Sequence, residues 1–334
     1  MKNLNKHYQY HETTIKGPKT GVRAYARTPV FGNTLNLGEV LIIRGKMTRT
    51  ILAVLAHPDD ESFGIGGTLA LYSRRGYDTY LICATGGEEG TMEAEHLNGN
   101  KDKAEVRSRE LENAAKILGL KGVFLLGYRD SGMPGSEANK HPKAQINHPL
   151  DEVAGRVVKY IRGLKPDVVI TFDPIGGYKH PDHIHIHQAI GLAFEKADDA
   201  SFHPEAGILS RDEGRPFKPR ALYFQVFPRR ILRWTVHLMP LFGKDPTKFG
   251  RNQDVNLKEL AEVDFPVHVR LDIRPVAGIK HEAGAAHASQ GGMQMRRGLM
   301  GFVARLVGER EDFMRAYPPV DKRFRRKRDL FDGI

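Results

Sequence analysis

Two stretches of the sequence combine imidazole and carboxylate side chains at a density that packing alone does not explain. The first reads His57-Pro-Asp-Asp-Glu61. The second reads His180-Pro-Asp-His183 and is followed by His185 and His187. Such nitrogen and oxygen donors are ligands that zinc accepts in catalytic sites, which keep one coordination position open for water. Together the two stretches supply enough donors for one metal ion and leave spare groups for acid–base chemistry.

The same residues allow simpler interpretations. Asp59, Asp60 and Glu61 would favour the positive end of a following helix whether or not they bind a metal. His183 and His187 are four residues apart and could bind as a helical pair, so the sequence does not settle which histidines are ligands. A dinucleotide-binding loop is disfavoured. The glycines that follow do not form G-x-G-x-x-G, and carboxylates stand where a pyrophosphate would approach.

The elements that must position these side chains alternate along the chain. Four apolar runs predict buried strands, at 50–56, 80–83, 123–126 and 166–172. Three helical patterns separate them, over about 64–75, over 102–118 and from Pro149 onward. This alternation predicts an α/β fold, a Rossmann-like parallel sheet with helices on both faces. Ligands bind at the carboxyl ends of such strands, so the two stretches, which follow the first and fourth strands, should meet at one site.

The rest of the chain is less regular. After about residue 200 the sequence predicts four segments: a strand over 221–227, an irregular insertion over 234–256, and helices over 276–289 and 297–317. Residues 322–328 are all basic except Phe324 and are expected to lie in a solvated tail. The predicted organisation is an N-terminal extension over 1–46, a single domain over 47–316 with a Rossmann-like core over about 50–200 and a C-terminal portion over 201–316, and a basic tail over 317–334.

Composition narrows the function classes. The 334 residues carry 51 Lys and Arg against 40 Asp and Glu, a formal net charge of +11. This surplus suits nucleic acid, an anionic lipid surface or an anionic substrate, but its concentration near one end argues against specific nucleic-acid recognition. The single cysteine, Cys83, excludes an internal disulfide framework. Neither a membrane-spanning apolar run nor a secretory signal is visible, so a cytoplasmic location is expected.

Taken in order, the motifs resemble those of the PIG-L/LmbE-like family of zinc-dependent N-deacetylases. The matching segments extend from about residue 50 to 290 and are 56–62, 86–90, Arg107 with Glu110-Leu111, 128–133, 176–183, and Lys280 with 287–290. The first and fifth segments together are highly specific. Within the family the motifs are most similar to those of deacetylases in the mycothiol and bacillithiol pathways, which act on N-acetylglucosamine joined to inositol or malate, and to the related amidase of mycothiol S-conjugates.

The resemblance implies a role for each matching residue at the metal. His57, Asp60 and His183 would hold the zinc ion. Asp59 would be the general base, and His180 the general acid that also stabilises the developing oxyanion.

Further residues would surround this centre. Asp182 would tune His180, with Tyr178 nearby. Arg107 and Asp130 would hold sugar hydroxyls, and Glu89 would contact substrate from the turn after the second strand. Simpler readings stay open at these positions: Arg107 could be a solvated ion-pair partner of Glu110, and Asp130 a turn former.

The function implied is removal of an N-acetyl group from an N-acetylglucosamine-type conjugate, by attack of zinc-bound water with Asp59 as base and His180 as acid. Zinc is expected from the ligand types, although such sites also accept Fe²⁺. Two alternatives remain: a zinc amidase acting on another small amide, such as a thiol conjugate, and a basic binding protein with a degenerate metal site. Thr91 replaces an acidic residue of the mycothiol-pathway enzyme, which weakens transfer of that substrate. The expected partner is a small N-acetylated sugar conjugate, and no specific binding of nucleic acid is expected. Formation of a homo-oligomer is left open.

Overall fold

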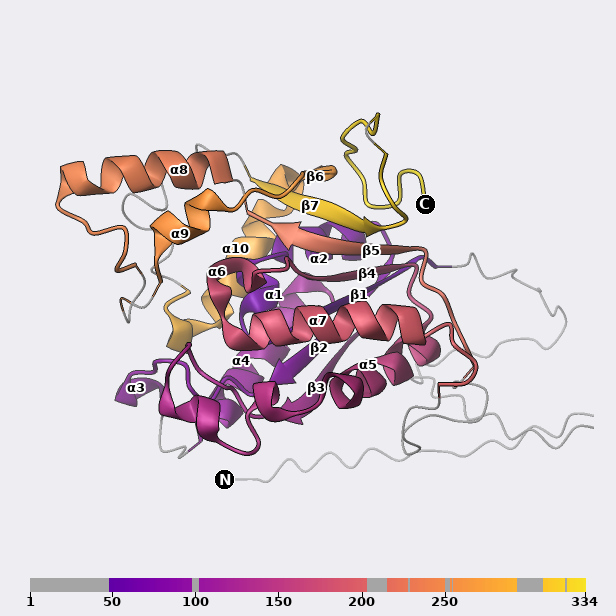
Figure 1. The fold of residues 1–334 in the computed structure, drawn as a ribbon, viewed down its shortest axis with the longest axis horizontal. Coiled ribbons are helices and arrows are strands. Elements are labelled where there is room, and N and C mark those ends of the chain that lie inside the picture. Colours follow the sequence, from indigo (N-terminus) through magenta and orange to yellow (C-terminus); the bar gives the residue numbers. More distant parts are fainter. Residues whose placement is uncertain are drawn as a thin grey trace, which may run out of the picture. The chain divides into compact units, whose positions relative to one another are not determined.

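The computed structural model describes residues 48–97, 102–202, 215–227, 229–249, 253, 255–292, 309–321 and 323–334. Within these ranges seven strands form one sheet with the order β3-β2-β1-β4-β5-β7-β6 (Figure 1). The strands are β1 (Thr50–Leu55), β2 (Asp78–Thr85), β3 (Gly122–Tyr128), β4 (Val168–Phe172), β5 (Ala221–Val226), β6 (Val269–Asp272) and β7 (Arg310–Tyr317). The first five run parallel, as predicted, and β7 runs antiparallel to both β5 and β6.

Helices cover both faces of the sheet. In Figure 1, α5 (Leu150–Leu164) and α7 (Pro181–Lys196) lie in front, whereas α2 (Gly66–Arg74), α4 (Lys103–Leu118) and α10 (Ala277–Ala286) lie behind. The remaining helical elements are α1 (Asp60–Phe63), α3 (Ala94–Leu97), α6 (Gly176–Lys179), α8 (Arg229–Leu238), α9 (Leu257–Glu262), η1 (Glu137–Lys140), η2 (Gln145–Asn147), η3 (Met239–Phe242), η4 (Arg274–Val276) and η5 (Ala288–Gln290). The predicted α/β fold with helices on both faces is therefore confirmed.

Local sequence explains the best-predicted elements. All six residues of β1 are buried, as a continuous apolar run at the centre of a covered sheet requires. Helix α4 begins where the Asp102 side chain accepts a hydrogen bond from the backbone N–H of Ala104 (2.9 Å). It ends at Gly119, whose φ of 76° closes the last turn.

The predicted helix over 297–317 is wrong over its last eight residues. Residues 310–317 form β7, and residues 297–308 lie outside the described residues. Pairing with a strand on each side places Phe313 in the core with no exposed surface. Strand formation here depends on these long-range partners, which a helical pattern in the local sequence cannot reveal.

The segment predicted as an irregular insertion, 234–256, is partly helical. It contains the second half of α8 and all of η3. Val236 and Met239 are buried against Leu257 and Leu260 of α9, in a small apolar cluster separate from the main core. Helix α8 therefore depends on packing with a partner that follows about twenty residues later, and a short window does not show that partner.

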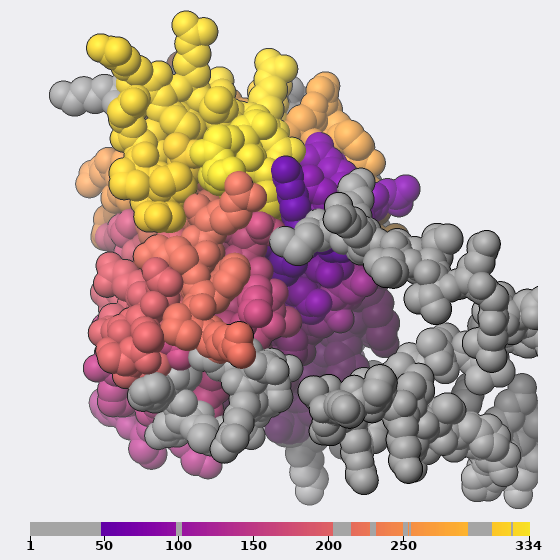
Figure 2. Space-filling view, turned by 90° about the vertical axis from the view of Figure 1, so that its right-hand side faces the viewer, coloured from indigo at the N-terminus to yellow at the C-terminus, as the bar shows by residue number. Residues whose placement is uncertain are grey.

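The C-terminal residues pack on the sheet instead of forming a wholly solvated tail. Leu330 has no exposed surface, and Phe331 lies against Tyr72 and Tyr77. Lys327 forms a parallel bridge with Val269 of β6. Figure 2 shows these residues, in yellow, as a continuous part of one face. The predicted 1–46 extension lies outside the described residues, and no described helix is long and apolar enough to cross a membrane.

Replacing Gly67 by alanine is expected to destabilise the fold. A Cβ atom there would lie 2.5 to 2.8 Å from three side-chain atoms of Ile273. Such overpacking costs about 1–3 kcal/mol, which exceeds the roughly 1 kcal/mol that alanine gains over glycine in a helix. Urea unfolding should therefore show a lower midpoint. Gly191→Ala is the matched control, because nothing lies within 4 Å of its Cβ position, and it should be neutral or stabilising.

Candidate metal centre and active site

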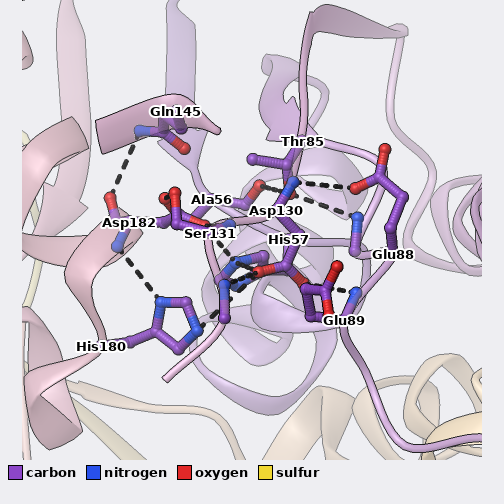
Figure 3. Close-up of polar contacts among 12 residues, drawn as sticks. Ala56, His57, Thr85, Glu88, Glu89, Asp130, Ser131, Gln145, His180 and Asp182 are labelled. Atoms are coloured by element: carbon purple, nitrogen blue, oxygen red, sulfur yellow. Dashed lines mark hydrogen bonds and ion pairs between the residues drawn. The ribbon is translucent and has the colours of Figure 1, made fainter. Parts of the chain in front are cut away.

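Three loops at the carboxyl ends of the parallel strands bring the predicted residues together. His57 follows β1, Asp130 follows β3, and His180 and Asp182 begin α7 after β4. Figure 3 shows these four side chains around one point, with Glu89 approaching from the turn after β2. The predicted parallel arrangement of these strands had implied that the residues after them would lie close together.

The three residues implied as metal ligands converge. His57 Nδ1 lies 3.1 Å from His183 Nε2 and 3.5 Å from Asp60 Oδ2, and His183 Nε2 lies 3.4 Å from Asp60 Oδ1. In a tetrahedral zinc site with bonds of about 2.0–2.1 Å, neighbouring ligand atoms are about 3.3 Å apart. The spacing of these donors therefore matches that of a zinc site.

Hydrogen bonds at the far side of each ring support the same assignment. His57 Nε2 lies 3.1 Å from Asp182 Oδ2, and His183 Nδ1 lies 3.1 Å from the Gly176 carbonyl oxygen. Each of these nitrogens donates to its oxygen, so the opposite nitrogens, His57 Nδ1 and His183 Nε2, carry lone pairs. Two lone pairs and the Asp60 carboxylate facing one another would repel unless a cation lay among them. The donor set fits a divalent metal.

The other histidines are sorted by their partners. His185 Nε2 contacts the His148 carbonyl oxygen at 3.1 Å, and His187 Nδ1 contacts the Phe172 carbonyl oxygen at 2.9 Å. The helical pair of His183 with His187 is therefore not the ligand set. A nitrogen of His180, in contrast, lies within 4.8 Å of a ring nitrogen of His57 and of one of His183, so His180 lies next to the proposed ligands.

Asp182→Asn is expected to weaken metal binding by about 10- to 100-fold, because the Asp182 carboxylate fixes the orientation and tautomer of the His57 ring. Titration of the metal-free protein with zinc in a competing chelator measures this affinity. Asp198→Asn, at an exposed carboxylate, is the control and should bind zinc like the wild type. Equal affinities of the Asp182 variant and the wild type would contradict the orienting role.

Asp59 lies beside the ligands in an unusual backbone conformation, with φ at 125°. Its Oδ2 accepts a hydrogen bond from Arg107 Nη2 at 2.9 Å. Burial raises the pKa of Asp59 to about 6, against the opposing effect of the Arg107 charge. A carboxylate with such a pKa can accept a proton near neutral pH and release it again, as a general base requires.

Arg107 is almost fully buried, which excludes the reading of a solvated partner for Glu110. Besides Asp59, its guanidinium donates to the carbonyl oxygens of Gly87 (2.7 Å) and Pro58 (2.6 Å). Arg107 also lines the cavity, which is compatible with the predicted contact with substrate. That contact stays a prediction. Arg107 therefore connects the loop after β2, through Gly87, to the carboxylate of Asp59.

His180 is held by the backbone of α7 and not by the Asp182 carboxylate. Its Nδ1 accepts a hydrogen bond from the backbone N–H of Asp182 at 3.2 Å, and its Nε2 lies 4.0 Å from Asp130 Oδ1. The Asp182 carboxylate instead binds Ser131 Oγ and His57. A carboxylate oxygen of Asp182 still lies within 4.8 Å of a His180 nitrogen, so the predicted tuning of His180 by that charge stays a prediction.

Burial lowers the pKa of His180 well below its ordinary value, and the nearby His57 and His183 lower it further, which outweighs the opposing charges of Asp130 and Asp60. A neutral His180 with Nδ1 accepting a bond carries its proton on Nε2.

Asp130 and Glu89 form a connected rim. Asp130 Oδ1 accepts a bond from the Gly132 N–H (2.8 Å), and its Oδ2 accepts one from the Glu89 N–H (3.3 Å). Burial would raise the pKa of Asp130, but His57 outweighs this effect and lowers it far below the ordinary value. The Glu89 carboxylate pairs with Arg129 at 2.6 Å. Asp130 is thus more than a turn former, and it stays ionised beside the ligands.

A cavity of about 230 Å³ opens above these groups. Its walls combine predicted site residues, their chain neighbours and two residues from other segments, and they are His57, Asp59, Glu89, Gly90, Thr91, Arg107, Asp130, Gly132, Met133, Tyr178, His180, Val255 and Gln290. Tyr178 lies here as predicted, with its ring 4.9 Å from that of His183. Burial raises the pKa of the Tyr178 hydroxyl above its ordinary range, so the hydroxyl keeps its proton.

The site also contains a buried pair, Glu61 and His287, for which no role was predicted. The Glu61 carboxylate accepts a bond from the Asp59 backbone N–H at 3.0 Å and lies 2.7 Å from His287 Nε2. Neither Glu61 nor His287 has any exposed surface. The position of Glu61 next to the ligands was a signal, but its partner lies 226 residues away. This pair holds the backbone of Asp59 in place.

Comparison with known proteins agrees with this site. Residues 52–194 match the family model described as PIG-L: GlcNAc-PI de-N-acetylase. A protein of Streptomyces avermitilis named 1D-myo-inositol 2-acetamido-2-deoxy-alpha-D-glucopyranoside deacetylase is 36% identical over 251 residues, which are 72% of this chain and 83% of the relative. A protein of Catenulispora acidiphila with the same name, numbered 1, is 44% identical over 72% of this chain and 75% of the relative.

The chain belongs to the PIG-L family. The resemblance predicted from the motifs is thereby confirmed. Among solved structures, N,N'-diacetylchitobiose deacetylase from Pyrococcus horikoshii is similar to this PIG-L chain with a TM-score of 0.54 and 20% identity, covering 81% of this chain and 84% of that one. This likeness concerns the fold, and it agrees with the predicted α/β class. The PIG-L match spans all three proposed ligands and ends before His287.

Proposed function

We propose that the chain is a zinc-dependent hydrolase that removes the N-acetyl group from an N-acetylglucosamine unit joined to a small polyol such as inositol. One observation carries the proposal: two lone-pair nitrogens and a carboxylate converge with the spacing of a metal site, directly beside the partly buried carboxyl of Asp59. The names of the relatives support the sugar conjugate as substrate. The complete donor set speaks against a degenerate site in a binding protein.

His57, Asp60 and His183 would hold the metal ion. When bound, the ion supplies a lowered pKa for a water molecule and polarises the acetyl carbonyl. Asp59 accepts the proton of the attacking water at Oδ1, since Oδ2 is engaged by Arg107. Water oxygen then bonds to the carbonyl carbon, the C–N bond breaks, and the products are acetate and the free amine.

His180 supplies a hydrogen-bond donor to the developing oxyanion from Nε2. The general acid role expected for His180 needs a second proton on Nδ1, where the Asp182 backbone N–H already donates. We therefore assign return of the proton to the leaving amine to Asp59, whose pKa of about 6 suits both directions of transfer.

Release of free amine from a substrate panel tests the proposal. The panel contains N-acetylglucosamine linked to inositol, N-acetylglucosamine linked to malate, free N-acetylglucosamine and an N-acetylated thiol conjugate. We expect turnover of a glycosidic conjugate that disappears with a chelator and returns with zinc. Cleavage of the thiol conjugate alone would favour the amidase alternative. Stoichiometric zinc with no amine released from any member would overturn the proposed reaction.

A further inference from the structure

An apolar surface is exposed on the far side of α8. We call it the α8 face, and it consists of Trp234, Leu238, Leu241 and Phe242. Their exposed fractions are 68%, 46%, 77% and 64%. These four are most of the large apolar side chains that are strongly exposed in the described part of the chain. A cluster of this kind marks a site of interaction.

The opposite side of the same segment is already packed. Val236 and Met239 are buried against Leu257 and Leu260 of α9. Helix α8 and η3 are therefore apolar on two sides, and the described part of the chain covers only one of them. In Figure 1, α8 lies at the upper left, above α9 and beyond the end of the sheet. The uncovered side needs an apolar environment from outside the domain.

The segment that carries the α8 face is rich in cationic residues, one of which, Arg233, pairs with Asp264 at 3.5 Å. Residues 229–248 contain five Lys and Arg, and Asp245 is their only acidic residue. Lys244 and Lys248 are exposed beside the apolar side chains. Apolar side chains that include tryptophan, bordered by cationic ones, are characteristic of segments that lie in the interface of an anionic bilayer.

We propose that the α8 face binds the surface of an anionic lipid bilayer, with the apolar side chains at the level of the head groups. A second copy of the chain is a poorer occupant. A two-fold contact through this face would place the cationic borders of both copies opposite each other, where they repel. Four side chains also fall short of the 20–30 residues a side, or about 800 Å², that stable interfaces use.

The surface lies close to the active site. Tyr178 and Val255 pack against the same small apolar cluster as α8, and both also line the cavity. Bilayer binding would therefore hold the cavity near the lipid surface, whatever substrate the cavity takes. The proposal does not depend on the deacetylase reaction.

Fluorescence provides a direct test, because Trp234 is the only tryptophan of the chain. Vesicles of phosphatidylglycerol and phosphatidylcholine in equal parts should shift the emission of the full chain to the blue and carry the protein into the vesicle pellet. High salt should weaken binding, and vesicles of phosphatidylcholine alone should bind less. The double variant Leu241→Ser with Phe242→Ser keeps the reporter and should partition about tenfold or more weakly.

Leu125→Ser is the matched control. Leu125 is 48% exposed on β3, away from the α8 face, and its replacement should leave binding unchanged. Emission and sedimentation of the wild type that do not respond to anionic vesicles would overturn the proposal. So would a concentration-dependent dimer in ultracentrifugation that the Leu241/Phe242 variant abolishes, since a second copy would then cover the face. Both measurements are independent of catalytic activity.

Discussion

Asp59→Asn is expected to lower kcat by about 10²- to 10⁴-fold while zinc stays bound. The amide keeps the shape of the side chain and can still accept the bond from Arg107, but it cannot take a proton from water. Asp59 is not one of the three converging donors, so its replacement leaves them unchanged. The loss should fall on kcat rather than on KM, because proton transfer belongs to the chemical step.

The measurement is steady-state amine release together with zinc content of the same preparation. Asp151→Asn removes an exposed carboxylate at the start of α5 and should leave both values unchanged. If the Asp59 variant kept wild-type turnover with full zinc, Asp59 would not be the base. Loss of zinc together with activity would show that Asp59 acts as a ligand instead.

His183→Ala should abolish both metal binding and turnover. One of three converging donors disappears, and the remaining pair, His57 and Asp60, cannot close the site. Wild-type protein should be stabilised against heat by added zinc, because a ligand that binds only the folded state shifts the unfolding equilibrium. The variant should show no such shift, which gives a readout that does not involve activity.

His187→Ala is the matched control for that variant. His187 lies one turn further along α7 and contacts the Phe172 carbonyl oxygen, away from the metal position. It should keep the zinc-induced shift in melting temperature. The ligand assignment fails if His183→Ala still binds one equivalent of zinc, or if His187→Ala is the variant that loses it.

Much of the site could be predicted because parallel strands impose a simple rule. The apolar runs of the sequence predict β1 and β4. Because the carboxyl ends of parallel strands meet at one edge of the sheet, they also predict that His57 lies near His183. The choice among the histidines could not follow from spacing. It depends on which ring nitrogen finds a carbonyl partner, Gly176 for one ring and Phe172 for another, and such contacts form only in the folded chain.

The errors share a cause, which is dependence on distant partners. Strand β7 forms between β5 and β6, and α8 forms against α9, so neither can be recognised within a short window. The hydrogen bonds of Asp182 have the same dependence, because the Asp182 carboxylate bonds His57 and Ser131, which lie 125 and 51 residues away in the sequence.

The buried contact between Glu61 and His287 has a consequence for how activity arises during synthesis. Every proposed metal donor lies within the first 183 residues, whereas the imidazole that steadies the backbone of Asp59 is made more than one hundred residues later. A nascent chain still attached to the ribosome can therefore contain all three proposed zinc donors before the contact that positions Asp59 has formed. Catalytic competence would come last, once residue 287 has left the exit tunnel and reached Glu61.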